Sequence, residues 1–162
     1  MGSAFTVKYK GIMKKLITDI EITYNGNTMK TVALWDTGAT DCCISKQVAN
    51  TLSLVATGKI SMQTPNGVSE ANTYLVDIML PNDVRIDDVR VADSEIGLQG
   101  IGMLIGMNII NQGDMAVSNN EGITIFSFRM PSAGIIDYVK QIKISNIIGE
   151  PHGRGKRKKK KK

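Results

Sequence analysis

The sequence of 162 residues contains one histidine, His152, and two cysteines, Cys42 and Cys43. His152 lies in a Gly- and Lys-rich segment, so no imidazole is held rigidly beside a nucleophile or a metal. This excludes His-based triads, Cys–His nucleophile pairs and His-ligated zinc sites. Neighbouring residues of a strand point to opposite faces, so a disulfide between Cys42 and Cys43 is not expected. We expect buried or half-buried thiols in a reducing compartment, and neither a metal nor a cofactor.

Long apolar runs are also missing. No run approaches the roughly 20 residues that cross a bilayer, and residues 1–15 lack the apolar centre of a secretory signal. The glycines at positions 97, 100, 102 and 106 do not have the spacing of a phosphate-binding loop or a dinucleotide-binding turn. We therefore expect a cytoplasmic protein with no membrane insertion, and nucleotide chemistry is not indicated.

Positive charge is concentrated at one end of the chain. Residues 151–162 hold 8 of the 20 basic residues and none of the 15 acidic ones. Residues 1–150 are left with 12 basic and 15 acidic residues, a net charge of −3, although the whole chain carries +5. We predict a folded domain at 1–150 and a disordered basic Lys-rich tail at 151–162. The tail either makes a non-specific polyanion contact or serves only as a solubilising extension.

The distribution of apolar residues predicts an all-β fold. Apolar positions alternate on both sides of the Asn25-Gly26 turn between residues 16 and 36, which is typical of a β-hairpin. A second, projecting hairpin is expected from strands at 59–63 and 73–80, with a turn at 64–67, and further strands at 84–92 and 123–128. Many short strands separated by Gly and Asn are typical of a barrel or a sandwich.

Helical patterns are scarce. Residues 45–52 predict one short helix with Ser45 as its N-cap. The apolar residues Ile135, Ile136, Val139 and Ile142 have the spacing of a C-terminal amphipathic helix.

The candidate catalytic residue is Asp36, within residues 33–40, Ala-Leu-Trp-Asp-Thr-Gly-Ala-Thr. A carboxylate at the end of an apolar strand is poorly solvated, and its ionised form needs hydrogen-bond donors. Gly38 allows backbone N–H groups to turn toward that carboxylate, and the Thr37 hydroxyl can tie the loop down. The alternative interpretation is that Asp36 merely caps a turn.

These residues resemble the catalytic loop of the retropepsin-like, or retroviral-type, aspartic proteases. Residues 103–110, Met-Leu-Ile-Gly-Met-Asn-Ile-Ile, are similar to the segment that in this family passes beside the catalytic loop and leads into a short helix. Residues 112–117 and 125–131 resemble single-domain members found in prokaryotes, so the likeness covers roughly residues 16–131. Many members have an acidic residue directly after Asp-Thr-Gly-Ala, whereas this sequence has Thr40 there and Asp41 one place later.

The resemblance implies a retropepsin-like barrel whose active site is formed by a homodimer. The chain has one Asp-Thr-Gly and no second copy, so one chain supplies half a site, with Asp36, Thr37 and Gly38 as its catalytic residues. The hairpin turn at 64–67 corresponds to the family's flap, or else is a surface hairpin without a role. The substrate contacts implied by the family are Ala39, Thr40, Pro65, Asn66, Gly67 and Ile105.

The resemblance thus implies an aspartic endopeptidase acting on peptides or proteins. Two like carboxyl groups pressed together share one proton, which supplies one general base and one general acid. The alternative is a catalytically silent dimer of the same fold that acts as a binding module through its basic tail.

Overall fold

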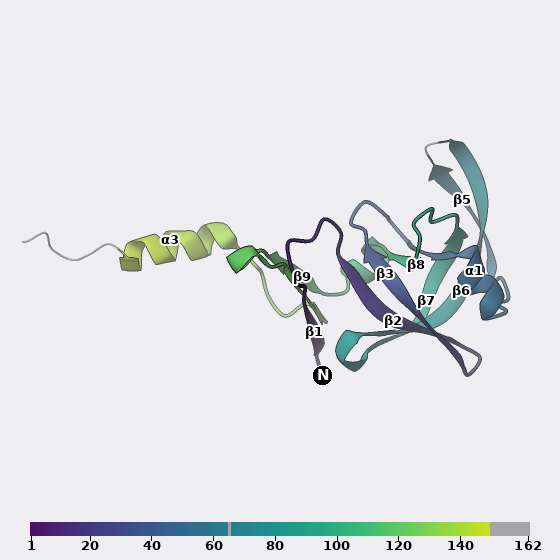
Figure 1. Ribbon diagram of the computed structural model, residues 1–162, viewed down its shortest axis with the longest axis horizontal. Helices are drawn as coiled ribbons and strands as arrows, with labels where there is room; N and C mark the ends of the chain where they lie inside the picture. The colour runs from purple at the N-terminus through teal and green to yellow at the C-terminus, as the bar shows by residue number, and fades with distance from the viewer. Residues whose placement is uncertain (65, 150–162) are drawn as a thin grey trace, which may run out of the picture.

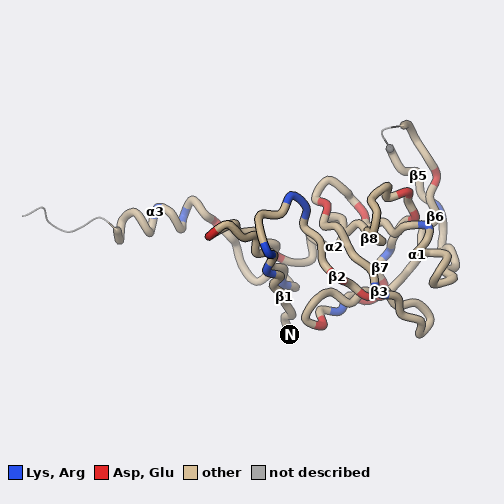
Figure 2. The backbone as a smooth tube through the Cα atoms, viewed as in Figure 1, with Lys and Arg blue, Asp and Glu red and all other residues tan. Residues whose placement is uncertain are grey.

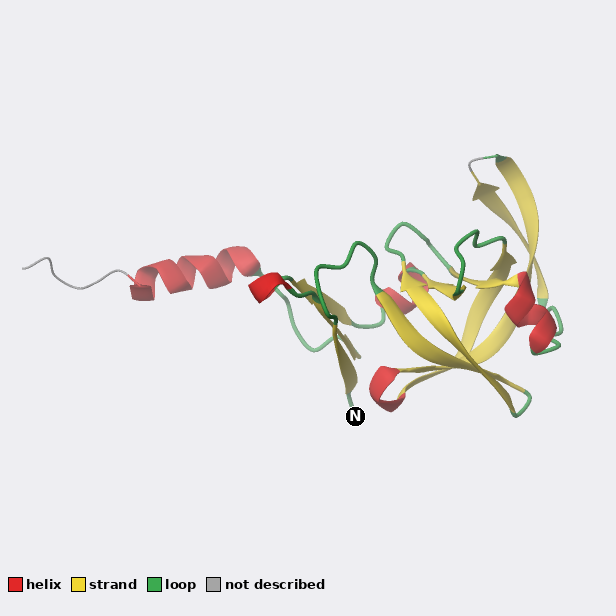
Figure 3. Ribbon diagram, viewed as in Figure 1, coloured by secondary structure: helices red, strands yellow, loops and turns green. Residues whose placement is uncertain are grey.

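The computed structural model describes residues 1–64 and 66–149, and within these ranges the chain is mainly β-structure (Figures 1 and 3). The strands are β1 (Ser3–Lys8), β2 (Ile17–Tyr24), β3 (Asn27–Trp35), β4 (Cys42–Ser45), β5 (Gly58–Thr64), β6 (Gly67–Leu80), β7 (Val84–Ser94), β8 (Ile101–Ile105), β9 (Asp114–Ser118) and β10 (Ile125–Met130). Two short 3-10 turns, η1 (Pro81–Asp83) and η2 (Asn120–Gly122), join neighbouring strands. The predicted all-β class is confirmed.

Six strands close into a barrel. The larger sheet has the order β2-β3-β8-β4-β7-β6-β5, and an additional pairing between β2 and β6 joins the ring, leaving β5 outside it. Burial alternates along β2, as expected for a barrel wall with one face toward the core: Thr18, Ile20 and Ile22 are buried, while Asp19 is exposed. The predicted hairpin at 16–36 is confirmed as β2 and β3, with the turn at Asn25-Gly26.

The second hairpin projects from the barrel, as predicted, but its second strand is longer than expected (Figure 1). β6 begins at Gly67 rather than at residue 73, and its first residues pair with β5, ending at the Thr64↔Gly67 partners. Residues 67–70 are exposed on both faces of the hairpin, so they lack the apolar alternation on which the prediction depended. Pro65 lies outside the described residues.

A small sheet of order β1-β10-β9 packs against the barrel through aromatic side chains. The ring of Trp35, the last residue of β3, lies 5.0 Å from that of Phe126 and 5.1 Å from that of Phe128, measured between centroids. Phe5 of β1 lies 5.8 Å from Trp35. Trp35 also donates a hydrogen bond from Nε1 to Thr18 Oγ1 at 3.0 Å. The end of β3 is therefore held in the core by the aromatic rings of the small sheet and by Thr18 of β2.

The helices are α1 (Lys46–Thr51), α2 (Met107–Ile110) and α3 (Tyr138–Gly149). The predicted Ser45 cap is confirmed, since its side chain accepts a hydrogen bond from the Val48 N–H at 3.2 Å. Figure 1 shows α3 extending away from the barrel, beyond the small sheet, and α3 has no buried residue. The predicted helix begins only at Tyr138, so Ile135 and Ile136 precede it, and its apolar residues are distributed around the axis rather than along one side. The expected amphipathic stripe is therefore absent. No helix in the described ranges has the length and apolar character to cross a bilayer.

Candidate active site

Asp36 directly follows β3 and begins the loop that carries Asp-Thr-Gly, called here the Asp36 loop (residues 36–41). Its backbone N–H donates to the carbonyl of Ile105 at 2.9 Å, which links the loop to β8. The Gly38 N–H donates to Asp36 Oδ1 at 2.9 Å, and the Ala39 N–H to the Asp36 carbonyl at 3.2 Å. The Gly38 N–H orients the carboxylate, and because Asp36 is only half-buried it remains reachable from solvent. A Cβ on Gly38 would lie 3.2 Å from Asp36 Oδ1, which explains why a glycine fits here.

The second predicted element, residues 103–110, lies beside this loop as expected. β8 runs parallel to β3, with Trp35 opposite Ile105, and the chain then enters α2. The N–H of Met107 donates to the Ala39 carbonyl at 2.8 Å. A Cβ on Gly106 would lie 2.8 Å from that same carbonyl oxygen and 2.6 Å from that of Asp41, so the close approach requires glycine.

Asn108 completes the contact between the two segments. Its backbone N–H donates to the Thr40 carbonyl at 3.0 Å, and its Oδ1 accepts from the Cys42 N–H at 2.9 Å and from the Cys42 thiol at 3.0 Å. Its Nδ2 donates to the Arg90 carbonyl of β7 at 3.3 Å. Asn108 therefore links the Asp36 loop to both β4 and β7. Sequence reasoning did not single out this residue.

A cleft of about 1010 Å³ opens beside Asp36, between the Asp36 loop and the β5–β6 hairpin. Of the predicted site residues, it brings together Asp36, Gly38, Ala39, Thr40 and Asn66. Thr37 is exposed and Gly67 lies at the hairpin turn, and neither is among the residues that line this cleft.

The prediction for Ile105 needs a correction. Its side chain is fully buried in the barrel core, whereas the side chain of its neighbour Leu104 lines the cleft. Alternate residues of a strand face opposite sides, and here the core takes Ile105. Ile105 contributes to the site through its carbonyl, which holds Asp36.

The two cysteines are free thiols that face different surroundings, as the alternation of a strand predicted. Cys42 belongs to the barrel core, and burial raises the pKa of its thiol to about 12. Cys43 belongs to a separate apolar cluster that lines the cleft. Burial raises the pKa of the Cys43 thiol, and the charges of Asp41, Asp36 and Asp93 raise it further. Both thiols are thereby kept protonated near neutral pH.

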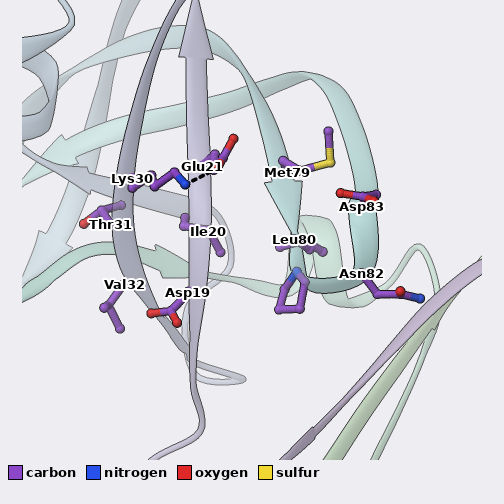
Figure 4. A pocket seen from close by; sticks show the side chains of 11 residues that line it. Asp19, Ile20, Glu21, Lys30, Thr31, Val32, Met79, Leu80, Asn82 and Asp83 are labelled. Atoms are coloured by element: carbon purple, nitrogen blue, oxygen red, sulfur yellow. Dashed lines mark ion pairs between the residues drawn. The ribbon is translucent and has the colours of Figure 1, made fainter.

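A second hollow lies away from this cleft, between β2, β3 and the turn η1 (Figure 4). Its volume is about 580 Å³, and the Glu21–Lys30 ion pair of 3.2 Å crosses one side. None of the predicted site residues lines it. Among the described residues, no group of three or more His, Cys, Asp or Glu side chains is placed to hold a metal ion.

The family described as "gag-polyprotein putative aspartyl protease" matches residues 20–112, which include both the Asp36 loop and residues 103–110. The chain belongs to this family of aspartyl proteases. No curated protein matches the chain.

The retropepsin-like protease described next agrees with this assignment at the level of the fold. A retropepsin-like aspartic protease from Rickettsia conorii has a TM-score of 0.52 and 15% sequence identity, over 80% of this chain and 96% of that one. The EIAV protease, solved with the inhibitor HBY-793, has a TM-score of 0.46 and 21% identity, over 64% of this chain and 91% of that one. The protein thus has the retropepsin-like fold found in the Rickettsia protease.

Proposed function

We propose that the protein is an aspartic endopeptidase whose active site forms when Asp36 of two protomers meet on a two-fold axis. The observation that carries the proposal is the single half-buried Asp36 at the edge of a large cleft, in a chain that has only one Asp-Thr-Gly. An isologous dimer places a residue against its own copy, so one such loop per chain is sufficient. Thr37, exposed beside Asp36, would brace the two loops across the axis.

Two carboxyl groups in contact across the axis share one proton, because both cannot ionise together. This is the general behaviour of aspartic-protease dyads. The ionised Asp36 takes a proton from water while the water oxygen bonds to the scissile carbonyl carbon. The protonated Asp36 of the other chain donates its proton to the carbonyl oxygen. The resulting diol collapses as one hydroxyl returns its proton to the Asp36 that had donated one. The C–N bond breaks, and the proton taken from water passes from the other Asp36 to the leaving amine, which restores the starting dyad.

The β5–β6 hairpin would close over the bound peptide. Its residues Ile60–Gln63 and Asn66 already line the cleft, so a small movement of the hairpin would exclude water from the dyad. In this proposal Pro65, Asn66 and Gly67 are the flap turn, and Ala39 and Thr40 contact substrate on the opposite wall.

The test is cleavage of a peptide library by wild-type protein and by Asp36→Asn, side by side. Asparagine has nearly the same shape as aspartate and removes only the titrating proton. We expect the variant to lose hydrolysis while keeping its fold and its dimer. Wild-type turnover by Asp36→Asn would show that Asp36 is only a turn residue.

The basic end of the chain supports a second, subsidiary proposal. α3 carries Lys140 and Lys143 and precedes the eight basic residues of 151–162, so this end would attract a polyanion. A catalytically silent binding module is not favoured, because the chain keeps Asp36 and the loop hydrogen bonds that orient it. Two free buried thiols are typical of a reducing compartment and favour the cytoplasm.

A further inference from the structure

Asp93, near the end of β7, is a half-buried carboxylate in the wall of the cleft. Its Oδ1 accepts a hydrogen bond from the Asn72 N–H at 2.9 Å. Its Oδ2 accepts from Asn72 Nδ2 at 3.2 Å and from the hydroxyl of the buried Tyr74 at 2.9 Å. These three donors come from β6 and fix the carboxylate in place before any ligand arrives, so little entropy is lost when it binds a partner.

The charge of Asp93 is not neutralised within the described part of the chain. Three other acids of the cleft each face a cation: Asp41 lies 3.5 Å from Arg90, Glu70 lies 3.6 Å from Lys59, and Glu95 lies 3.1 Å from Lys46. The donors to Asp93 are an amide, a backbone N–H and a phenol, all uncharged. Figure 2 shows several acidic positions on the side of the barrel from which the β5–β6 hairpin projects. Apart from Asp36, Asp93 is therefore the cleft carboxylate whose charge is left for a ligand.

The cleft also has an apolar part. A cluster of small buried residues lines it, and longer apolar side chains pack against that cluster. Its members are Cys43, Ala71 and Ala92, with Ile60, Met62 and Leu104 against them. A lysine or arginine side chain suits a cleft that offers both apolar surface and an anion, because its alkyl stem packs on apolar surface while its charged end seeks an anion.

From this arrangement we infer that Asp93 is a specificity-determining residue, which binds a Lys or Arg side chain of the substrate close to the scissile bond. The inference rests on the proposed function, since it assigns a substrate class to the same cleft. Asp93 could otherwise serve only to clamp β6 through Asn72 and Tyr74. The experiment must therefore separate charge recognition from a structural role.

Binding to the Asp36→Asn dimer measures recognition without cleavage. The probes are fluorescein-labelled apolar peptides in which Lys or norleucine replaces each residue in turn. Norleucine keeps most of the alkyl stem and lacks the charge. We expect one position at which the Lys peptide binds about tenfold more tightly than the norleucine peptide, the usual effect of a charged hydrogen bond. This ratio of affinities should fall at high salt.

In the Asp36→Asn background, the added change Asp93→Asn should reduce the ratio of Lys to norleucine affinity to about one. Asp93→Glu should retain part of the preference, because it keeps the charge even if it disturbs the clamp. Glu70→Gln is the matched control: its carboxylate also lines the cleft but already faces Lys59, so the ratio should persist. Equal loss of affinity for both peptides in Asp93→Asn would assign Asp93 a structural role only and overturn the inference.

Cleavage by the wild-type protein separates the two proposals. Cleavage of both peptides at equal rates, with equal binding, would overturn the role of Asp93 and leave the protease assignment standing. A Lys preference in binding without any wild-type cleavage would support Asp93 and overturn the protease assignment.

Discussion

The side-chain oxygen of Asn108 accepts hydrogen bonds from both the backbone N–H and the thiol of Cys42, at 2.9 and 3.0 Å. This places the start of α2 against the strand that follows the Asp36 loop. The Gly106 N–H in turn donates to the Cys42 sulfur at 3.3 Å. The loop that carries Asp36 is thus held by a short buried network as well as by the β3–β8 pairing.

Asn108→Ala should destabilise the protein and slow catalysis. The change leaves the buried Cys42 N–H without its acceptor, which should lower the free energy of unfolding by about 1–3 kcal/mol. Urea unfolding and peptide turnover measure the two effects. Gln112→Ala is the control, because its side chain is exposed and, among the described residues, its hydrogen bond goes to the Asn108 carbonyl; it should change stability by about 0.5 kcal/mol or less. An Asn108→Ala protein as stable as wild type would show that this network does not hold the loop.

The Cys42 thiol should resist alkylation in the folded protein. Burial raises its pKa to about 12, so little thiolate is present near neutral pH. The stability that this thiol contributes is present below its ordinary pKa of 9.0 and is lost as the pH rises toward 12, because the unfolded state ionises first. We expect iodoacetamide to modify Cys42 only after unfolding, as mass spectrometry would show.

Activity should survive thiol blockers and chelators. Inhibition that added zinc reverses would contradict the assignment.

Asp114 should stabilise the protein only above acidic pH. Hydrogen bonds from Ser132 Oγ and the Ala133 N–H, together with Arg129, lower the pKa of Asp114 from 3.8 to about 2. Its contribution is therefore present above the unfolded pKa and is lost as the pH falls through about 2. Urea unfolding should show that Asp114→Asn is less stable than wild type near neutral pH, and that the difference disappears toward pH 2. A difference independent of pH would mean that the charge is not responsible.

The parts of the fold that local sequence determines were predicted from the residues themselves, whereas pairing between distant segments was predicted only where the family resemblance supplied it, as for residues 103–110 beside the Asp36 loop. The Asn25-Gly26 hairpin and the Ser45 cap depend on residues that are close in sequence. β1 was not predicted, because it pairs with β10, with Ser3 opposite Met130. Pairing between residues so far apart in the sequence leaves no local pattern.

The same distinction applies to the site. Asp36 and Gly38 belong to a short motif, so they were found, whereas the burial of Ile105 depends on which face of β8 meets the core. Asn108 and Asp93 act through contacts with β4 and β6, and no spacing in the sequence marks them.

Deletion of residues 151–162 should leave the cleavage of a short neutral peptide unchanged. Beyond Pro151, these residues contain no apolar side chain that would dock them on the domain. Their removal leaves a net charge of −3 and should abolish salt-sensitive retention on a polyanion column. Loss of turnover at unchanged dimer content would show that these residues belong to the catalytic unit.

The most direct test of the central claim mixes wild-type and Asp36→Asn protomers at constant total concentration, after dissociation and reassociation. If each active site needs Asp36 from both chains, equal proportions should leave about a quarter of the activity, because only wild-type pairs are active. Differently tagged protomers verify that mixed dimers have formed. Activity that falls only in proportion to the wild-type fraction, to about a half, would show that one protomer carries a complete site and would contradict the shared dyad.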